Sequence, residues 1–189
     1  SIEGDYKLAA YDDAGALEAY KKSLSIDPGE YPVWNQVMIM EYQAGQYENL
    51  YKHSSECLEL FPTIPTIYLL NGISANQLNK YDEAIDVLSA GIEVIVDDKP
   101  LKAEFYGQIG EAYFRNNELA VGVTNYKKGI KMDPGSLLIK NSFAKSLALS
   151  NHDLDLAMSL AGQITDAEPE NAIFLDTYGL VLFSKGEYK

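Results

Sequence analysis

Few residues in this chain have the types and spacing that chemistry requires. The 189 residues include two histidines and one cysteine, which are His53, His152 and Cys57. The histidines lie far apart in the sequence, and neither has a Cys or His neighbour at the spacing of a metal-ligand pair. A single cysteine excludes an internal disulfide, and Cys57 is expected to be a buried apolar filler. We therefore predict no metal site and no cofactor.

The remaining candidates for catalysis have simpler interpretations. Asp12–Asp13 and Asp97–Asp98 are adjacent carboxylates in predicted connections, which is more typical of helix ends and solvated loops than of an acid–base pair. Ser54–Ser55 has no triad context. Gly107 and Gly110 belong to a helical segment rather than to a loop that holds phosphate. We therefore predict that the chain is not an enzyme and has no catalytic residue.

The composition limits the classes of partner. The formal net charge is −13, with 28 acidic and 15 basic residues. This charge disfavours nucleic acid and anionic lipid surfaces, because both require clusters of Lys and Arg. It favours a basic protein or peptide, although an acidic surface that only keeps the protein in solution explains it as well. No run of 18 apolar residues is present, so no membrane span is expected.

A repeat of about 34 residues runs through the sequence. Pro28 and Pro62 are 34 residues apart, and Pro134 and Pro169 are 35 apart. Twelve residues before each proline a shared position is occupied by Ala16, Leu50, Gly122 and Ala157. Six residues after each proline another is occupied by Trp34, Tyr68, Lys140 and Leu175. Such a period is typical of a helical solenoid, in which neighbouring units share one core.

These positions resemble the tetratricopeptide repeat (TPR), whose pattern is W-x2-L-G-x2-Y, then A-x3-F, then P. The best-matched unit reads Tyr106-x2-Ile109-Gly110-x2-Tyr113, then Gly122-x3-Tyr126, then Pro134. Two other units open with Tyr68-x2-Asn71-Gly72-x2-Ala75 and Leu175-x2-Tyr178-Gly179-x2-Leu182. Small residues such as Gly110 and Gly122 would let paired helices approach closely.

The resemblance implies an all-α, right-handed α–α superhelical solenoid of helix hairpins, forming one array over residues 1–189. The expected units are 1–30 (partial), 31–64, 65–102, 103–136, 137–171 and 172–189 (partial). Gly4 occupies the small position of a truncated opening helix, and the last residues should lead into a further second helix. We therefore expect an excised part of a longer array. The last two units look most like bacterial TPR proteins, including envelope-associated ones, which favours the periplasm or outer membrane through a part of the parent outside this sequence.

Two irregularities in the repeat predict local changes. The third unit has Val96 where a proline is expected, and four extra residues precede Tyr106. Four residues are about one helical turn, so we expect a longer second helix that ends near residues 97–100. The fifth unit carries one extra residue in its turn, around residues 150–153.

In the TPR architecture the first helices of successive units line a concave groove, and the resemblance implies the same surface here. The positions not used for packing are Asn35, Ile39, Tyr42, Gln43, Leu69, Ile73, Asn76, Gln77, Gly107, Glu111, Phe114, Arg115, Asn141, Lys145 and Leu149. Amides suit hydrogen bonds to a peptide backbone, and Tyr42 and Phe114 could anchor apolar side chains. The predicted binding residues are Asn35, Tyr42, Gln43, Asn76, Gln77, Glu111, Phe114, Arg115, Asn141 and Lys145. The alternative is that these are ordinary surface or packing residues.

Two functions remain open at this point. The first is a non-enzymatic scaffold that binds a protein or peptide segment in the groove. The second is a targeting or regulatory TPR array attached to an enzyme domain outside this chain. A clamp for a C-terminal carboxylate, as in TPR co-chaperones, is disfavoured. The corresponding positions hold Asn35 with Ile39, Thr66 with Leu70, and Glu104 with Gln108 rather than the family's Lys, Asn and Arg.

Overall fold

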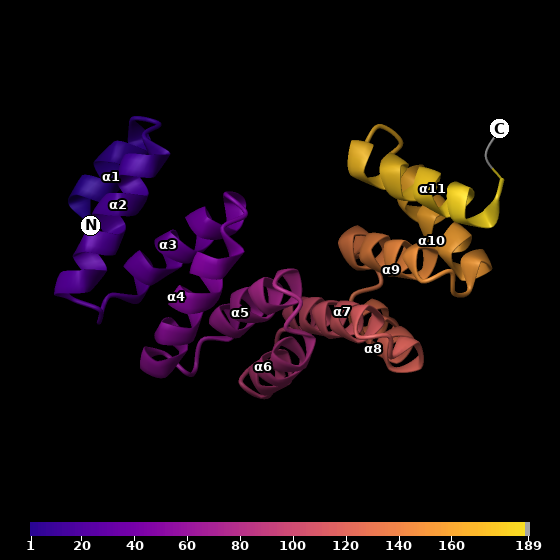
Figure 1. Ribbon diagram of the computed structural model, residues 1–189, viewed down its shortest axis with the longest axis horizontal. Helices are drawn as coiled ribbons and strands as arrows, with labels where there is room; N and C mark the ends of the chain where they lie inside the picture. Colours follow the sequence, from indigo (N-terminus) through magenta and orange to yellow (C-terminus); the bar gives the residue numbers. More distant parts are fainter. Residues whose placement is uncertain (188–189) are drawn as a thin grey trace. The chain divides into compact units, whose positions relative to one another are not determined.

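The computed structural model describes residues 1–187, which form eleven helices and contain no strand (Figure 1). The chain is an all-α helical repeat, as predicted. Its contacts divide it into two compact parts, Ser1–Val94 and Ile95–Lys189. They are called unit 1 and unit 2 below, are larger than the repeat units named above, and are described one at a time. The single continuous array over residues 1–189 stays a prediction.

Unit 1 consists of three helix pairs and unit 2 of two pairs followed by one helix. In unit 1 the helices are α1 (Ile2–Ala9), α2 (Asp13–Ile26), α3 (Tyr31–Gln43), α4 (Tyr47–Leu60), α5 (Pro65–Gln77) and α6 (Tyr81–Glu93). In unit 2 they are α7 (Lys99–Arg115), α8 (Leu119–Met132), α9 (Leu137–Leu149), α10 (Leu154–Ala167) and α11 (Ala172–Lys185).

The first helix of each of the five pairs, and α11 as well, ends in the same turn. The small position of the repeat is the one occupied by Gly4, Met38, Gly72, Gly110, Ala144 and Gly179. Seven residues after it, the backbone has a positive φ in all six helices, at Tyr11, Gly45, Asn79, Asn117, Asn151 and Gly186. The following N–H donates back over five residues, as from Lys80 to the Ala75 carbonyl at 2.9 Å and from Glu118 to the Tyr113 carbonyl at 2.8 Å. Gly and Asn adopt this left-handed conformation at the lowest cost, so these residues end the helix and reverse the chain.

Glycine at the small position lets the two helices of a pair come close. A Cβ at Gly4 would lie 2.5 Å from the Tyr20 ring, and a Cβ at Gly110 would lie 2.8 Å from the Tyr126 ring. Gly72 is covered by Leu88 in the same way. The covering residue comes sixteen positions later in all three pairs. The missing side chain on one helix is therefore replaced by a large side chain from the other.

The four extra residues of the third repeat unit lengthen α7, whereas the sequence predicted a longer α6. α6 ends at Glu93, whereas α7 begins at Lys99 and contains 17 residues. The carboxylate of Asp98 accepts a hydrogen bond from the Leu101 N–H at 2.9 Å, and Pro100 lies in the first turn of α7. Both features favour a helix start at this point, so the prediction that α6 extends to residues 97–100 is wrong.

The longer turn of the fifth unit is present as predicted. α9 ends at Leu149 and α10 begins at Leu154. Two residues of the turn, Asn151 and Asp153, have positive φ, and the Asp153 carboxylate accepts from the Leu156 N–H at 3.2 Å. The added residue is therefore absorbed in the turn without changing the pairing of the helices.

Each unit has its own apolar core. In unit 1 it includes Tyr20, Trp34, Met38, Leu50 and Cys57, and Cys57 is the buried filler that we expected. Burial raises the pKa of the Cys57 thiol to about 12. In unit 2 the core is built around three aromatic rings, Phe114, Tyr126 and Phe143, with Leu147 and Leu160 beside them. The rings of Tyr126 and Phe143 are stacked at 4.7 Å.

Candidate partner-binding surfaces

The predicted binding residues of unit 1 differ in their accessibility. Tyr42 is 44 % exposed, and Gln43 and Gln77 are exposed as well. Asn35 is half-buried, and its side-chain oxygen accepts a hydrogen bond from the Tyr31 hydroxyl at 3.5 Å. Asn76 is fully buried in the last turn of α5. The expectation that Asn76 presents its amide in an open groove is therefore wrong.

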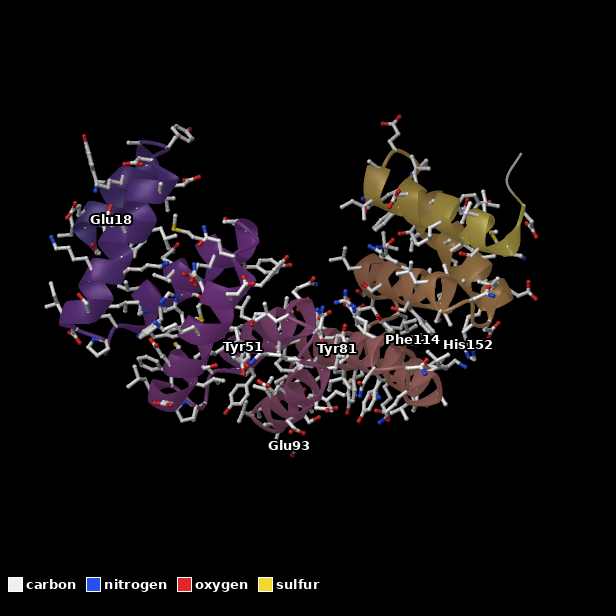
Figure 2. The ribbon with its side chains drawn as sticks, viewed as in Figure 1. Glu18, Tyr51, Tyr81, Glu93, Phe114 and His152 are labelled. Atoms are coloured by element: carbon white, nitrogen blue, oxygen red, sulfur yellow. The ribbon has the colours of Figure 1, made fainter. Side chains whose placement is uncertain are left out.

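Phe114 is also buried, at 7 % exposure, and is part of the core of unit 2 (Figure 2). Its ring lies 5.8 Å from Tyr126 and 6.2 Å from Phe143. A Cβ at Gly122 would lie only 2.5 Å from Cδ2 of Phe114, so the ring occupies the space that the glycine leaves. The expectation that Phe114 is an exposed aromatic anchor is therefore wrong.

The other predicted residues of unit 2 form a polar cluster. Arg115 Nη1 lies 3.8 Å from Glu111 Oε1 on α7. Burial raises the pKa of Glu111, while the nearby charges of Arg115 and of Lys145 on α9 act in the opposite direction. The structure therefore brings Glu111, Arg115 and Lys145 together from two first helices.

Asn141 lies one helical turn before Lys145 on α9, and it is 8 % exposed. Among the described residues, its side-chain oxygen has no hydrogen-bond partner. That oxygen is itself buried, so an incoming peptide group does not reach it in this conformation. Within the cluster of Glu111, Arg115, Asn141 and Lys145, the accessible donors are Arg115 and Lys145, and Glu111 is a half-buried acceptor.

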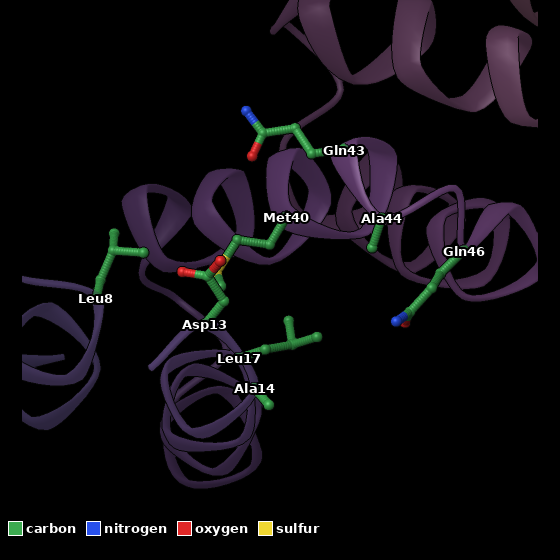
Figure 3. A pocket seen from close by; sticks show the side chains of 8 residues that line it. All are labelled: Leu8, Asp13, Ala14, Leu17, Met40, Gln43, Ala44 and Gln46. Carbon is green, nitrogen blue, oxygen red and sulfur yellow. The ribbon is translucent and has the colours of Figure 1, made fainter. Parts of the chain in front are cut away.

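Unit 1 has a pocket of about 340 Å³ between α1, α2 and the end of α3 (Figure 3). It is lined by Leu8, Asp13, Ala14, Leu17, Met40, Gln43, Ala44 and Gln46. Most of the lining is apolar, and Asp13, Gln43 and Gln46 supply the polar groups. Met40 is half-buried, and its thioether can adapt to different side chains. Such a pocket suits an apolar side chain with a cationic group beside Asp13.

Of these lining residues the repeat register predicted Gln43 alone. The others come partly from α2, a second helix, and from the turns that join the helices. The repeat register selects groove positions on first helices only, so it does not predict Asp13, Leu17 or Gln46. The adjacent carboxylates Asp12–Asp13 are a visible signal in the sequence, but their pattern indicates a helix terminus. Asp12 does cap α2, where it accepts from the Gly15 N–H at 3.0 Å.

The sequence pattern also does not predict a buried ion network in unit 1. Glu41 is 0 % exposed on α3, and one of its carboxylate oxygens lies 2.7 Å from Lys21 Nζ on α2 and 2.8 Å from His53 Nδ1 on α4. Glu41 occupies the position of the repeat that holds Ala75, Tyr113 or Leu147 in other units. A buried carboxylate requires partners, so the network joins three helices of unit 1.

No group of three or more His, Cys, Asp or Glu side chains in residues 1–187 is placed to hold a metal ion. His152 is exposed in the turn before α10. None of the helices that the structure describes has the length and apolar character needed to cross a membrane.

A family model described as tetratricopeptide repeat matches residues 103–136, which are α7, α8 and their connection. Residues 103–136 are a tetratricopeptide repeat, in a chain that has the TPR fold. This is the unit in which the sequence pattern is most complete. Its glycines, Gly110 and Gly122, occupy the small positions of the TPR pattern and are both buried.

Known proteins resemble the chain over different lengths. The Hsp70-Hsp90 organizing protein of Triticum aestivum is 26 % identical over 103 residues, which are 54 % of this chain and 17 % of that protein. TTC0263, a thermophilic TPR protein in Thermus thermophilus, has a TM-score of 0.75 at 16 % identity, covering 95 % of both chains. YrrB, described as a TPR protein with an unusual peptide-binding site, has a TM-score of 0.58 at 16 % identity, covering 92 % of this chain and 87 % of its own.

These likenesses differ in what they support. The chain spans less than a fifth of the length of the Triticum protein. The structural matches are at 16 % identity and show the fold alone. The matched unit and the fold are those of TPR proteins, which typically mediate protein–protein interactions.

Proposed function

We propose that this TPR chain is a non-enzymatic scaffold that binds an extended segment of a protein along its first helices. The observation that carries the proposal is the polar cluster of unit 2. Four of the residues that the repeat register selected, Glu111, Arg115, Asn141 and Lys145, gather on α7 and α9. Arg115 and Lys145 can donate to peptide carbonyls, and the carboxylate of Glu111 can accept from a peptide N–H.

Unit 1, taken by itself, offers a second surface that suits an apolar side chain next to a basic one. The pocket of unit 1 would take an apolar side chain against Leu17 and Met40, with a Lys or Arg beside Asp13. The net charge of −13 favours the same class of partner by attracting it at long range. YrrB, with its peptide-binding site, has a similar fold and supports a peptide as the ligand class.

The test is a selection of peptides from a random-sequence display library, followed by affinity measurements with the chain and with variants. We expect Arg115→Ala and Lys145→Ala each to weaken the selected peptides by about tenfold, which is about 1–2 kcal/mol. The matched control is the pair Lys127→Ala and Lys131→Ala, which removes two exposed cations from α8. Equal affinity of the first pair and the control pair would contradict the proposed site.

A further inference from the structure

Unit 1 has another pocket, of about 270 Å³, between α2, α3 and α4. Its lining includes Lys21, Leu24, Pro28, Trp34, His53 and Glu56. None of these residues is a groove position of the repeat register, because most of them come from the second helices α2 and α4. Sites for small molecules usually occupy about 300–1,000 Å³, so a pocket of this size has room for a single side chain.

His53 presents one ring nitrogen to this pocket in a fixed form. Its Nδ1 lies 2.8 and 2.9 Å from the two carboxylate oxygens of Glu41, which is 0 % exposed. An ionised carboxylate only accepts, so the hydrogen is assigned to Nδ1, and Nε2 of the neutral ring keeps its lone pair. Within residues 1–187 nothing bonds to Nε2, and it is not one of the buried polar atoms. It is therefore an open acceptor.

Lys21 places hydrogen-bond donors beside this acceptor. Its Nζ lies 2.7 Å from Oε1 of Glu41, the same oxygen that Nδ1 of His53 contacts at 2.8 Å. The ammonium and the imidazole are therefore neighbours, and the ammonium has two further N–H donors. Because the charge of Glu41 balances that of Lys21, the three residues together offer a donor and an acceptor without a net charge.

The wall of the pocket is apolar and aromatic. Leu24, Pro28 and Trp34 form it. The Nε1–H of Trp34 donates to the Pro28 carbonyl at 2.8 Å, so the polar group of the indole is already satisfied. The rings of Trp34 and His53 are tilted at 58° with their centroids 6.2 Å apart. An aromatic ligand would therefore pack on Trp34 with its polar end near His53.

The chemical group that complements this arrangement is a phenol. One hydroxyl can donate to Nε2 of His53 and accept from Nζ of Lys21, while the ring packs on the apolar wall. An indole has a donor but no acceptor for the ammonium, and a phenyl ring has neither. A carboxylate ligand would meet the charge of Glu56, and a Lys or Arg side chain would meet that of Lys21.

We propose that this pocket binds the tyrosine side chain of a partner protein. The hydroxyl lies between His53 and Lys21, and the ring packs against Leu24, Pro28 and Trp34. The pocket belongs to unit 1 and does not require the polar cluster of unit 2, so its test is independent of the function proposed above.

The test compares two compounds, N-acetyl-tyrosinamide and its match without the hydroxyl, N-acetyl-phenylalaninamide. Trp34 is the only tryptophan of the chain, so its fluorescence, excited beyond the absorption of both compounds, reports binding at the pocket. We expect a Kd on the order of 1 mM for the tyrosine compound and about fivefold weaker binding of the phenylalanine compound, which lacks the hydrogen bonds. Equal affinities, or no response to either compound, would overturn the proposal.

A variant of His53 tests the hydroxyl contact itself. In His53→Asn the side-chain nitrogen can still donate to Glu41, but nothing corresponds to Nε2. We expect the tyrosine compound to bind this variant about fivefold more weakly, no better than the phenylalanine compound, whose affinity is unchanged. The matched control is His152→Asn, which changes the exposed histidine of unit 2 and should affect neither compound.

Two further outcomes would contradict the assignment. A His53→Asn variant with the helical circular dichroism of the parent that still prefers the tyrosine compound would show that Nε2 is not the acceptor. Binding of p-cresol without binding of N-acetyl-tyrosinamide would show a pocket open only to a small phenol, and not to the side chain of a protein. The comparison of the two compounds on the unchanged chain does not depend on the folding of any variant.

Discussion

The α-carbon of Gly110 packs directly on the ring of Tyr126, so that a Cβ at residue 110 would lie 2.8 Å from Cδ2 of the ring. The reciprocal contact lies in the same hairpin, where the Phe114 ring fills the space beside Gly122. A Cβ at Gly122 would also lie 3.1 Å from the Gly110 carbonyl oxygen. Two glycines and two aromatic rings thus bring α7 and α8 together.

A larger side chain at Gly110 should force these helices apart. We expect Gly110→Leu to lower the free energy of unfolding by about 1–3 kcal/mol through overpacking. The matched control is Gly179→Leu, at the same repeat position with open space around it, which should cost nothing measurable. Denaturant titration of both variants checks this, and an unchanged midpoint for Gly110→Leu would show that the packing register is misplaced.

Tyr11 is in a backbone conformation that suits a different residue. It has a φ of +59° and is 94 % exposed, whereas the equivalent residues are Gly or Asn. Left-handed geometry costs an ordinary L-residue about 1–2 kcal/mol, and the exposed ring makes little packing contribution. We expect Tyr11→Asn to stabilise α1 by about 1 kcal/mol, measured by amide exchange. The converse substitution Asn117→Ala should destabilise unit 2 by a similar amount.

The buried carboxylate of Glu41 should depend on Lys21. Removing one partner of a buried charge leaves it poorly compensated, so Lys21→Met should cost about 1.5–3 kcal/mol. Glu41→Leu should cost far less, because Leu147 occupies the same repeat position in unit 2. The double variant should therefore be more stable than Lys21→Met alone. Thermal denaturation of the three variants tests this order, and additive losses would contradict a coupled network.

Phe114 and Tyr42 should behave differently although both were predicted as binding residues. Phe114→Ala removes a buried ring and should cost about 3–5 kcal/mol of stability. Tyr42→Ala removes an exposed ring, so its stability should stay within about 0.5 kcal/mol of the parent. Loss of peptide binding in the Tyr42 variant would then report on the surface itself. In the Phe114 variant the same loss would follow from unfolding of the core.

The pH dependence of stability should identify Glu111 as a residue whose ionisation is disfavoured. Burial raises its pKa, so its contribution to stability is present below the ordinary pKa of a glutamate and is lost as the pH rises through the raised value. Glu111→Gln should therefore raise the melting temperature at pH 7 but leave it unchanged near pH 3.5.

Glu83 provides a control of opposite sign. The Tyr51 hydroxyl donates to its carboxylate and lowers the pKa of Glu83, so the stabilisation that it provides is present at neutral pH and is lost as the pH falls through the lowered value. Glu83→Gln should not raise the melting temperature at pH 7. A gain at pH 7 in both variants would indicate a general effect of reduced negative charge.

The sequence by itself determined the helical hairpins and their register. Gly45, Asn79 and Asn117 specify the turns, because left-handed backbone geometry is a property of single residues. Gly110 and Gly122 specify where two helices approach. These are local preferences that recur at a fixed spacing, so the fold and the positions of exposed residues such as Tyr42 and Gln43 could be predicted.

The tertiary structure decided which side chains reach the surface. Phe114 is buried because Gly122 on another helix leaves room for its ring, and Glu41 is tolerated inside because Lys21 and His53 come from two other helices. The four residues of the cluster in unit 2 met only once α7 and α9 were packed. The direction and burial of a side chain depend on the volume and charge of residues distant in sequence, and a repeat pattern read along one chain does not contain that information.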